Sequence, residues 1–341
     1  MHTRPTTYRP RILVLAFASL SLLMLTGCLP SRVAIDLDPG DGKIQSTPVF
    51  ADHATGPFVT LPKVALIDIS GVLSHTPPAG LVTPATNIVD RVVARLREAE
   101  HDPQINAVVL RINSPGGTVG ASETLYEEIR RFRERSGKPV VVSMSDLAAS
   151  GGYYISLAAD HIVAQPSTVT GSIGVIFQTF NIADGLAMIG VQGRAITSGP
   201  NKAMASPFEP ARPEHFEIMQ AIVDDFYSDF QGRVIEHRPS LNAADVAMAT
   251  DGRVFTGRQA LELGLVDELG TLYDAFEVAK RLAGLHSAQL VKYHAEGTRV
   301  NSPYAQAQDT RPNAAERRTD ISLFNIEQDR FATGFYYLWR P

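Results

Sequence analysis

The sequence predicts an α/β fold in which a mainly parallel sheet is covered by helices. Short apolar runs bounded by turn residues alternate with longer segments whose apolar residues recur at helical spacing. The composition, 44% hydrophobic and 20% charged residues, is that of an ordinary globular protein, and 341 residues are enough for one large domain or two small ones.

The strands and helices are expected to alternate from residue 64 onward. Apolar runs predict buried strands at 64–69, 105–112, 139–144, 161–164 and near 173–177. Apolar residues at helical spacing predict helices around 89–96, 125–132, 150–159 and 219–230. This order is typical of strands that run parallel and are joined by crossover helices.

The first 28 residues have the pattern of an export signal. A front with three arginines precedes the apolar run at 12–25, which is shorter than the roughly 20 residues that a membrane-spanning helix usually needs. Leu25-Thr26-Gly27-Cys28 resembles a bacterial lipobox, which would place a lipid on Cys28. The alternative is an uncut anchor helix with an incidental cysteine. Both interpretations tether the protein to a membrane and place the rest of the chain outside the cytoplasm. The residue after the cysteine, Leu29, favours the outer membrane.

The regions on either side of the alternating segment look different from it. Residues 29–60 are rich in proline and glycine and are predicted to be a flexible spacer. Residues 61–285 are predicted to form the domain. Residues 286–341 are predicted to be a C-terminal tail, partly disordered, that ends in the aromatic cluster at 331–341. We expect this cluster to pack on its own domain or on a neighbouring subunit rather than on a membrane.

The charge and cysteine content exclude several classes of function. A net charge of −5 gives no indication of nucleic-acid binding, and the single cysteine rules out an intrachain disulfide. We expect no metal ion and no cofactor.

Ser150 lies in a loop that joins a predicted strand to a predicted helix, in Ala149-Ser150-Gly151-Gly152. A helix N-terminus offers free N–H groups, and Gly151 leaves the approach to the serine open. Ser150 is therefore a candidate nucleophile and Gly151 a candidate oxyanion donor. The alternative is a serine that only caps the helix, and on this loop alone the cap is favoured.

A second glycine loop, Asn113-Ser114-Pro115-Gly116-Gly117, follows the preceding predicted strand. Acyl transfer requires two donors aimed at one oxygen. Since neighbouring parallel strands end at the same edge of a sheet, Gly116 or Gly117 can supply the second donor. The two loops together favour an acyl-transfer site.

The base is not evident from local chemistry. His161 begins a predicted strand, which would carry it away from the end of the sheet that holds Ser150. A lysine can act as a base when burial lowers its pKa, and Lys202 is the only charged residue between Arg194 and Glu209. An exposed loop lysine remains the favoured alternative at this point.

Six ordered motifs over roughly residues 61–285 resemble the signal peptide peptidase A family of bacterial serine-lysine proteases, in its short, single-repeat form. The motifs are the strand at 64–71, Arg111–Gly117, Ala149–Tyr154, Thr170–Val175, Ser198–Lys202, and Val254–Gly257 with Gly264–Asp267.

The resemblance implies a Clp protease/crotonase-like fold and assigns roles to several residues. Ser150 is implied as nucleophile, Lys202 as base, Ser172 as the residue that orients the lysine, and Gly151 with Gly117 or Gly116 as oxyanion donors. The family cleaves hydrophobic peptides such as released signal peptides, prefers small or apolar residues beside the cut, and assembles as a homo-oligomeric ring. Whether Ser150 and Lys202 come from one chain stays open.

Two other functions remain as alternatives. A crotonase-like acyl-transfer enzyme also uses glycine-built oxyanion holes, but an exported protein has little access to coenzyme A. An inactive envelope scaffold is the other alternative. We therefore expect a membrane-anchored serine endopeptidase on the periplasmic side of a bacterial cell envelope.

Overall fold

A computed structural model describes residues 44–52, 60–77, 86–295, 300–305 and 334–339. The predicted export signal, Cys28 and most of the predicted spacer lie outside the described residues. Among the described helices, none is long and apolar enough to cross a membrane.

The described elements follow the predicted alternation. In chain order they are β1 (Ile44–Ala51), β2 (Lys63–Ser70), α2 (Ile88–His101), β3 (Ile105–Ser114), β4 (Gly116–Thr118), α3 (Val119–Ser136), β5 (Val140–Ala149), α4 (Gly151–Ser156), β6 (His161–Ala164), β7 (Val169–Gly171), β8 (Ile176–Gln178), α5 (Ala183–Met188), α6 (Pro213–His237), α7 (Ala243–Ala249), β9 (Val254–Thr256), α8 (Gly257–Leu263), β10 (Glu268–Leu269), α9 (Leu272–Leu282), β11 (Gln289–Ala295) and β12 (Gly334–Leu338). The strand expected near 173–177 is observed as the shorter β8, which overlaps it at 176–177, and the unpredicted strand β7 precedes it.

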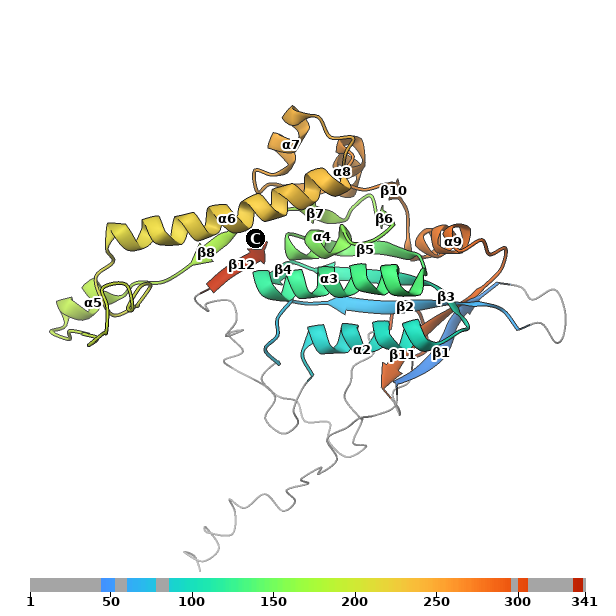
Figure 1. Cartoon of the computed structure of the whole chain (residues 1–341), viewed down its shortest axis with the longest axis horizontal. Helices are drawn as coiled ribbons and strands as arrows, with labels where there is room; N and C mark the ends of the chain where they lie inside the picture. Colours follow the sequence, from blue (N-terminus) through green and yellow to red (C-terminus); the bar gives the residue numbers. More distant parts are fainter. Residues whose placement is uncertain (1–43, 53–59, 78–85, 296–299, 306–333, 340–341) are drawn as a thin grey trace, which may run out of the picture. The chain divides into compact units, whose positions relative to one another are not determined.

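The main sheet is mostly parallel, which confirms the predicted α/β class. Its central order is β1-β11-β2-β3-β5-β6-β10, and the neighbouring pairs from β11 to β10 all run parallel. In Figure 1 the helices α2, α3 and α4 lie along the sheet. Parallel strands joined by crossover helices end at one edge of the sheet, so the loops after β3 and β5 meet there.

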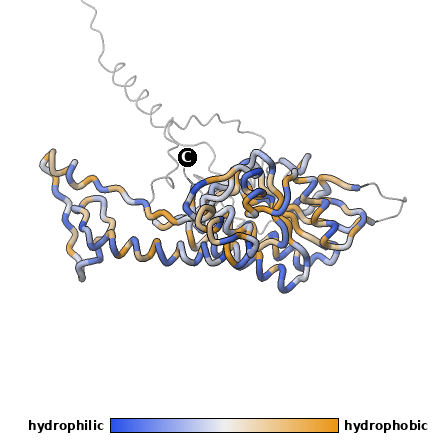
Figure 2. The backbone as a smooth tube through the Cα atoms, turned by 90° about the horizontal axis from the view of Figure 1, so that it is seen from above, coloured by the Kyte–Doolittle hydropathy of each residue, from blue (hydrophilic) through white to orange (hydrophobic). Residues whose placement is uncertain are grey.

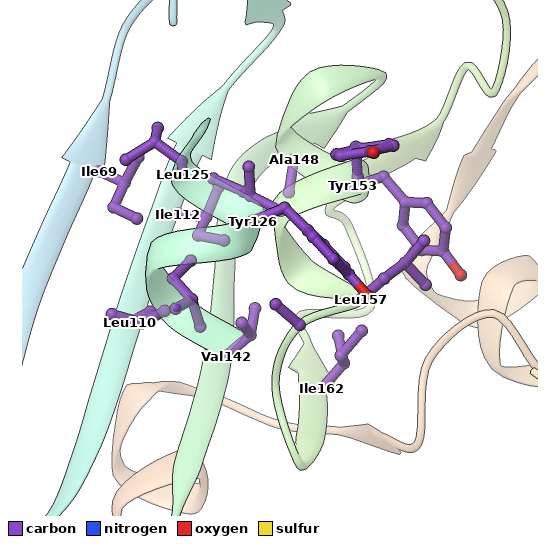
Figure 3. Close-up of a cluster of buried hydrophobic side chains, with 14 of the residues drawn as sticks. Ile69, Leu110, Ile112, Leu125, Tyr126, Val142, Ala148, Tyr153, Leu157 and Ile162 are labelled. Atoms are coloured by element: carbon purple, nitrogen blue, oxygen red, sulfur yellow. The ribbon is translucent and has the colours of Figure 1, made fainter. Parts of the chain in front are cut away.

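Successive side chains of a strand point to opposite faces of the sheet, and here both faces are buried. On β2, Ile67 and Ile69 belong to the core under α2, α3 and α4, and Val64 and Leu66 belong to the core under α9. Figure 3 shows the first core, where Leu125 and Tyr126 of α3 meet Ile112 and Val142 of the sheet.

The predicted spacer is wrong for Ile44–Ala51, which forms the strand β1. β1 lies at the edge of the sheet and pairs only with β11, and its register shifts between Pro48 and Phe50. An edge strand tolerates proline, since the missing N–H need not join a ladder. The proline that favoured a spacer is therefore compatible with this strand.

The predicted tail boundary at residue 286 is also wrong, because β11 lies inside the sheet between β1 and β2. The segment includes Lys292 and His294, whose side chains are unusual in a buried strand. Both side chains are buried and paired in the structure: Lys292 with Asp68, and His294 with Thr47.

The aromatic end of the chain packs on its own domain, in agreement with the preferred expectation. β12 runs antiparallel between β4 and β8 and forms a second, three-stranded sheet with them. Tyr337, in the middle of β12, is fully buried.

The segment β8–α5–α6 forms an arm beside the sheet (Figure 1). The C-terminal half of α6 packs against α4 through Phe230 and Tyr154, whose ring centroids lie 5.0 Å apart. At the other end of α6, Arg212 donates to the carbonyl of Pro200. The 17 residues from Pro213 to Phe230 span roughly 25 Å along a helix, so the loop that holds Lys202 lies well away from α4.

A buried ionic cluster joins three parts of the chain. Asp68 of β2 pairs with Arg111 of β3 at 2.7 Å and with Lys292 of β11 at 2.5 Å, and Lys292 is only 1% exposed. Both cations also donate to the carbonyl of Pro303, at 2.8 and 3.1 Å. Burial lowers the pKa of Lys292, and Asp68 opposes that shift. The cluster attaches the segment at 300–305 to the centre of the sheet.

The Asp68→Asn variant is expected to lower the free energy of unfolding by about 3 kcal/mol, because it leaves two buried cations without their carboxylate. Urea denaturation followed by circular dichroism measures the change. The matched control is Asp251→Asn, which removes an exposed carboxylate paired with Arg253 and should leave the midpoint nearly unchanged. Equal midpoints for the two variants would show that the cluster contributes nothing.

Candidate active site

Ser150 occupies the turn between β5 and α4 in a backbone conformation that serine rarely adopts. Its φ is 54° and its ψ is −115°, and its side chain makes no capping bond to the helix. Ser150 is thus the N-cap residue of α4 by position, but its side chain does not cap the helix. Strained strand-to-helix turns of this kind project a serine hydroxyl clear of the backbone, and strain of this kind is concentrated at functional sites.

Ser172 lies beside Ser150 at the same edge of the sheet. β7 pairs with β5 up to Ala149 and Gly171, and the two serines are the next residue on each strand. The Ser150 N–H donates to the Gly171 carbonyl at 2.7 Å, and the Ser172 N–H donates to Arg253 O at 2.7 Å. Ser172 also has a positive φ, of 50°. The structure thus brings together two of the predicted site residues.

The two glycine loops meet at Gly116. A Cβ on Gly116 would lie 2.7 Å from the Gly151 nitrogen and 2.0 Å from the Tyr337 oxygen. Gly116 also has a φ of +100°, which an L side chain rarely adopts. The space left by the missing Cβ therefore admits the Tyr337 carbonyl oxygen close to the Gly151 nitrogen. An oxyanion hole requires backbone nitrogens close to one oxygen in this way.

Gly117 faces the same oxygen. β12 pairs antiparallel with β4, with Tyr337 opposite Gly117, and the Trp339 N–H donates to Pro115 O at 2.8 Å. Bonded and non-bonded pairs alternate along an antiparallel ladder, so Gly117 and Tyr337 are the next bonded pair after Pro115 and Trp339. Of the two glycines expected as second donor, Gly117 is the one paired with Tyr337, and Gly116 leaves the space for the Tyr337 oxygen.

β12 lies in a slot next to Ser150. One wall is β4, which carries the glycines, and the other wall is β8, where Phe335 is paired with Phe177. The main chain in the slot is held along both edges, as in recognition of a peptide by strand addition. The tail of this chain therefore occupies the position that an extended peptide would take.

Neither candidate base lies beside Ser150 within one chain. Lys202 is exposed, and its loop lies at the end of α6 remote from Phe230. His161 is opposite Val141, near the start of β5, and the eight residues from Val141 to Ala149 span roughly 25 Å. The structure of one chain brings together Ser150, Ser172, Gly151, Gly116 and Gly117, but not Lys202.

Sequence analysis missed the residues that surround the slot. Tyr154, four residues after Ser150, stacks on Tyr337 with ring centroids 5.1 Å apart, and Phe230 of α6 lies 4.8 Å from the same ring. The aromatic run at the C-terminus was the available indication. Its alternation of side chains is typical of a strand, but nothing in the sequence showed which sheet it joins.

The fold and the site define an α/β protein with a serine at a strained strand-to-helix turn and two glycine loops close beside it. The model of peptidase family S49 matches residues 132–286. A putative protease of Synechocystis sp. is 39% identical over 226 residues, which cover 66% of this chain and 76% of that protein.

Two further relatives cover different shares of their own length. Protease 4 of Salmonella typhi is 40% identical over 69% of this chain and 37% of its own, and a putative signal peptide peptidase SppA of Enterococcus faecium is 31% identical over 69% of this chain and 68% of its own. A solved structure of a ClpP1 mutant from Listeria monocytogenes aligns with a TM-score of 0.40 and 19% identity, over 62% of this chain and 93% of that one. The chain belongs to peptidase family S49, the signal peptide peptidase A family, and is thus a member of a protease family.

Gly116→Ala is expected to reduce peptide hydrolysis by about 100-fold or more, because its methyl group would occupy the space for the oxyanion. Hydrolysis of a fluorogenic peptide measures the loss. The control is Gly120→Ala in α3, where a Cβ would meet nothing within 4 Å and alanine favours the helix. Full activity in Gly116→Ala would contradict this assignment of the hole.

Proposed function

We propose that this protein is a membrane-anchored serine endopeptidase that hydrolyses hydrophobic peptides, such as released signal peptides, with Ser150 as nucleophile and Lys202 as base. The observation that carries the proposal is the peptide carbonyl of Tyr337, which lies between the glycine loops beside Ser150. This carbonyl lies next to the residue that follows Ser150, which supports the proposal that a bound strand is attacked there.

The proposed reaction uses the groups in a fixed order. Neutral Lys202, oriented by Ser172, takes the proton of Ser150 as its oxygen attacks the peptide carbonyl carbon. The N–H groups of Gly117 and Gly151 stabilise the oxyanion, and Lys202 returns the proton to the leaving amine. Lys202 then activates a water molecule that hydrolyses the acyl-enzyme.

We infer that Lys202 reaches Ser150 from a neighbouring subunit of a homo-oligomeric ring. Within one chain its loop lies roughly 25 Å along α6 from the contact between Phe230 and Tyr154. A base carried on an arm can reach the serine of the next subunit in a head-to-tail ring.

The apolar surface of the arm supports assembly. The arm exposes large hydrophobic side chains that no described part of the chain covers; the most exposed are Ile196, Met188, Ile189, Phe216 and Phe208. Figure 2 shows hydrophobic residues interspersed with hydrophilic ones along the arm. An exposed apolar surface of this kind is typical of a protein interface.

The slot favours a peptide over the acyl-transfer alternative. Both edges of the bound strand are paired along β4 and β8, which selects an extended main chain rather than a coenzyme thioester. The scaffold alternative has no need of the strained Ser150 turn, since strain persists only where the surrounding structure maintains it.

Mixed assemblies test the shared dyad. Ser150→Ala and Lys202→Ala should each lose about 10⁴-fold or more of peptide hydrolysis. Chains of the two variants, unfolded and refolded together in equal amounts, should recover about a quarter of wild-type activity, because one interface in four pairs an intact serine with an intact neighbouring lysine.

Arg194→Ala is the control for the lysine variant, because it removes a cation from the same arm and should remain active. No recovery in the mixture would place both residues in one chain. Full activity of either single variant would exclude the dyad itself.

We further propose that the protein is exported to the periplasmic side of the envelope, most readily the outer membrane, and held by a lipid on Cys28. Cys28→Ser should then lose the lipid mass and the membrane association of the mature chain. Mass spectrometry and membrane fractionation measure these, and an unchanged membrane fraction would favour an uncut anchor helix.

A further inference from the structure

The side chain of Tyr337 fills an aromatic pocket next to the proposed nucleophile. Its ring lies 5.1 Å from Tyr154, with 29° between the planes, and 4.8 Å from Phe230. Its hydroxyl donates to the carbonyl of Phe226 at 3.0 Å, and the side chain is fully buried. The pocket thus has aromatic walls from α4 and α6 and a hydrogen-bond acceptor at its far end.

The position of Tyr337 in the slot gives this pocket a place in the reaction. The Tyr337 oxygen lies in the space at Gly116, beside the Gly151 nitrogen, and the residue is opposite Gly117. A residue whose carbonyl lies in the oxyanion hole is the one on the N-terminal side of the bond under attack. The pocket therefore receives the side chain of that residue.

We propose that this active site selects peptides with tyrosine on the N-terminal side of the cleaved bond, through a pocket formed by Tyr154, Phe230 and the Phe226 carbonyl. The proposal rests on the proposed function, since the pocket has this role only if Ser150 attacks the carbonyl in the hole. It departs from the small or apolar residue that the family resemblance implies at this position.

Three physical terms favour tyrosine. The two aromatic rings of the pocket pack on the ring of the inserted side chain, and leucine and alanine have no ring to offer. The phenol hydroxyl donates to the buried carbonyl of Phe226, a bond that phenylalanine cannot make. Burial raises the pKa of Tyr337 well above its ordinary range, so the hydroxyl keeps the proton that it donates. A site built to bond a hydroxyl discriminates against the analogue that lacks one.

The test uses the full-length Tyr337→Ala variant, which keeps the chain but empties the pocket. Four fluorogenic peptides differ only in tyrosine, phenylalanine, leucine or alanine before the cleaved bond. We expect kcat/KM to be highest for tyrosine, about 10-fold above phenylalanine and about 100-fold above alanine. Equal rates for tyrosine and phenylalanine, or a preference for leucine or alanine, would overturn the proposal.

A variant of the pocket tests whether Tyr154 causes the preference for tyrosine. Tyr154→Ala, added to Tyr337→Ala, should reduce the ratio of tyrosine to alanine hydrolysis by about 10-fold, because it removes the stacked ring. Tyr154→Phe keeps the ring and should keep most of the ratio. If the two Tyr154 variants show the same ratio as their parent, the pocket does not select the side chain.

Two further measurements keep the specificity and the protease activity separate. The Tyr337→Phe variant keeps the packed ring but loses the hydroxyl. Its tail should therefore compete less strongly with a peptide for the slot, and it should hydrolyse the tyrosyl peptide faster than the wild type does.

In the Ser150→Ala, Tyr337→Ala variant, binding of the tyrosyl and alanyl peptides is measured by calorimetry without catalysis. In one outcome, the tyrosyl peptide binds more tightly than the alanyl peptide while no variant that retains Ser150 hydrolyses either one. That result would refute the proposed protease activity and leave the pocket assignment intact. Hydrolysis without a tyrosine preference in rate or binding refutes the pocket alone.

Discussion

The arrangement of the site depends on one close approach, at Gly116. A carbonyl oxygen of β12 and the nitrogen of Gly151 both lie within 2.7 Å of the point where a Cβ would be. Any other residue at this position would keep the two loops and the strand apart. The positive φ of Gly116 turns β4 out of the line of β3, so β4 can pair with the strand in the slot. A single missing carbon thus permits the close approach of the two loops and the strand, and the edge of β4 that pairs with β12 begins at the same residue.

The rest of the sheet supplies the rigidity that this approach requires. β3 and β5 are paired over most of their length, so the loops that follow them are fixed relative to each other. Both faces of these strands are covered by large apolar cores. The strained turn at Ser150 can persist because the pairing of Ala149 with Gly171 and the first turn of α4 hold it from both sides. A site on flexible loops would relax this turn and lose the alignment of the donors.

Local chemistry predicted the residues of this edge and little of what surrounds it. Ser150 and the two glycine pairs follow strands with strong apolar patterns, so their meeting could be inferred from parallel topology. β1 and β11 were missed because they contain Pro48, Lys292 and His294, which are unusual in strands. These residues fit into the strands only because of partners that are distant in the sequence. The partner of β12 was equally hidden, since an isolated aromatic strand pattern does not indicate its sheet. Lys202 had only a weak local indication, its position among uncharged neighbours, and its proposed role depends on the ordered motifs.

The separation of Lys202 from Ser150 has a consequence for the tail. In a single chain the carbonyl oxygen of Tyr337 lies between the two glycine loops, while the proposed base is remote. Under the proposed mechanism, the isolated chain can hold a strand but cannot hydrolyse it. Assembly would then both complete the catalytic groups and determine when a bound strand becomes a substrate. The tail is tethered to the domain that holds the slot, and the segment at 300–305 that precedes it is attached to the buried Asp68 cluster. A tethered strand acts at a high effective concentration, so a free peptide must match its side-chain and main-chain contacts to displace it. The same slot that recognises a peptide would in this way exclude those that fit it poorly.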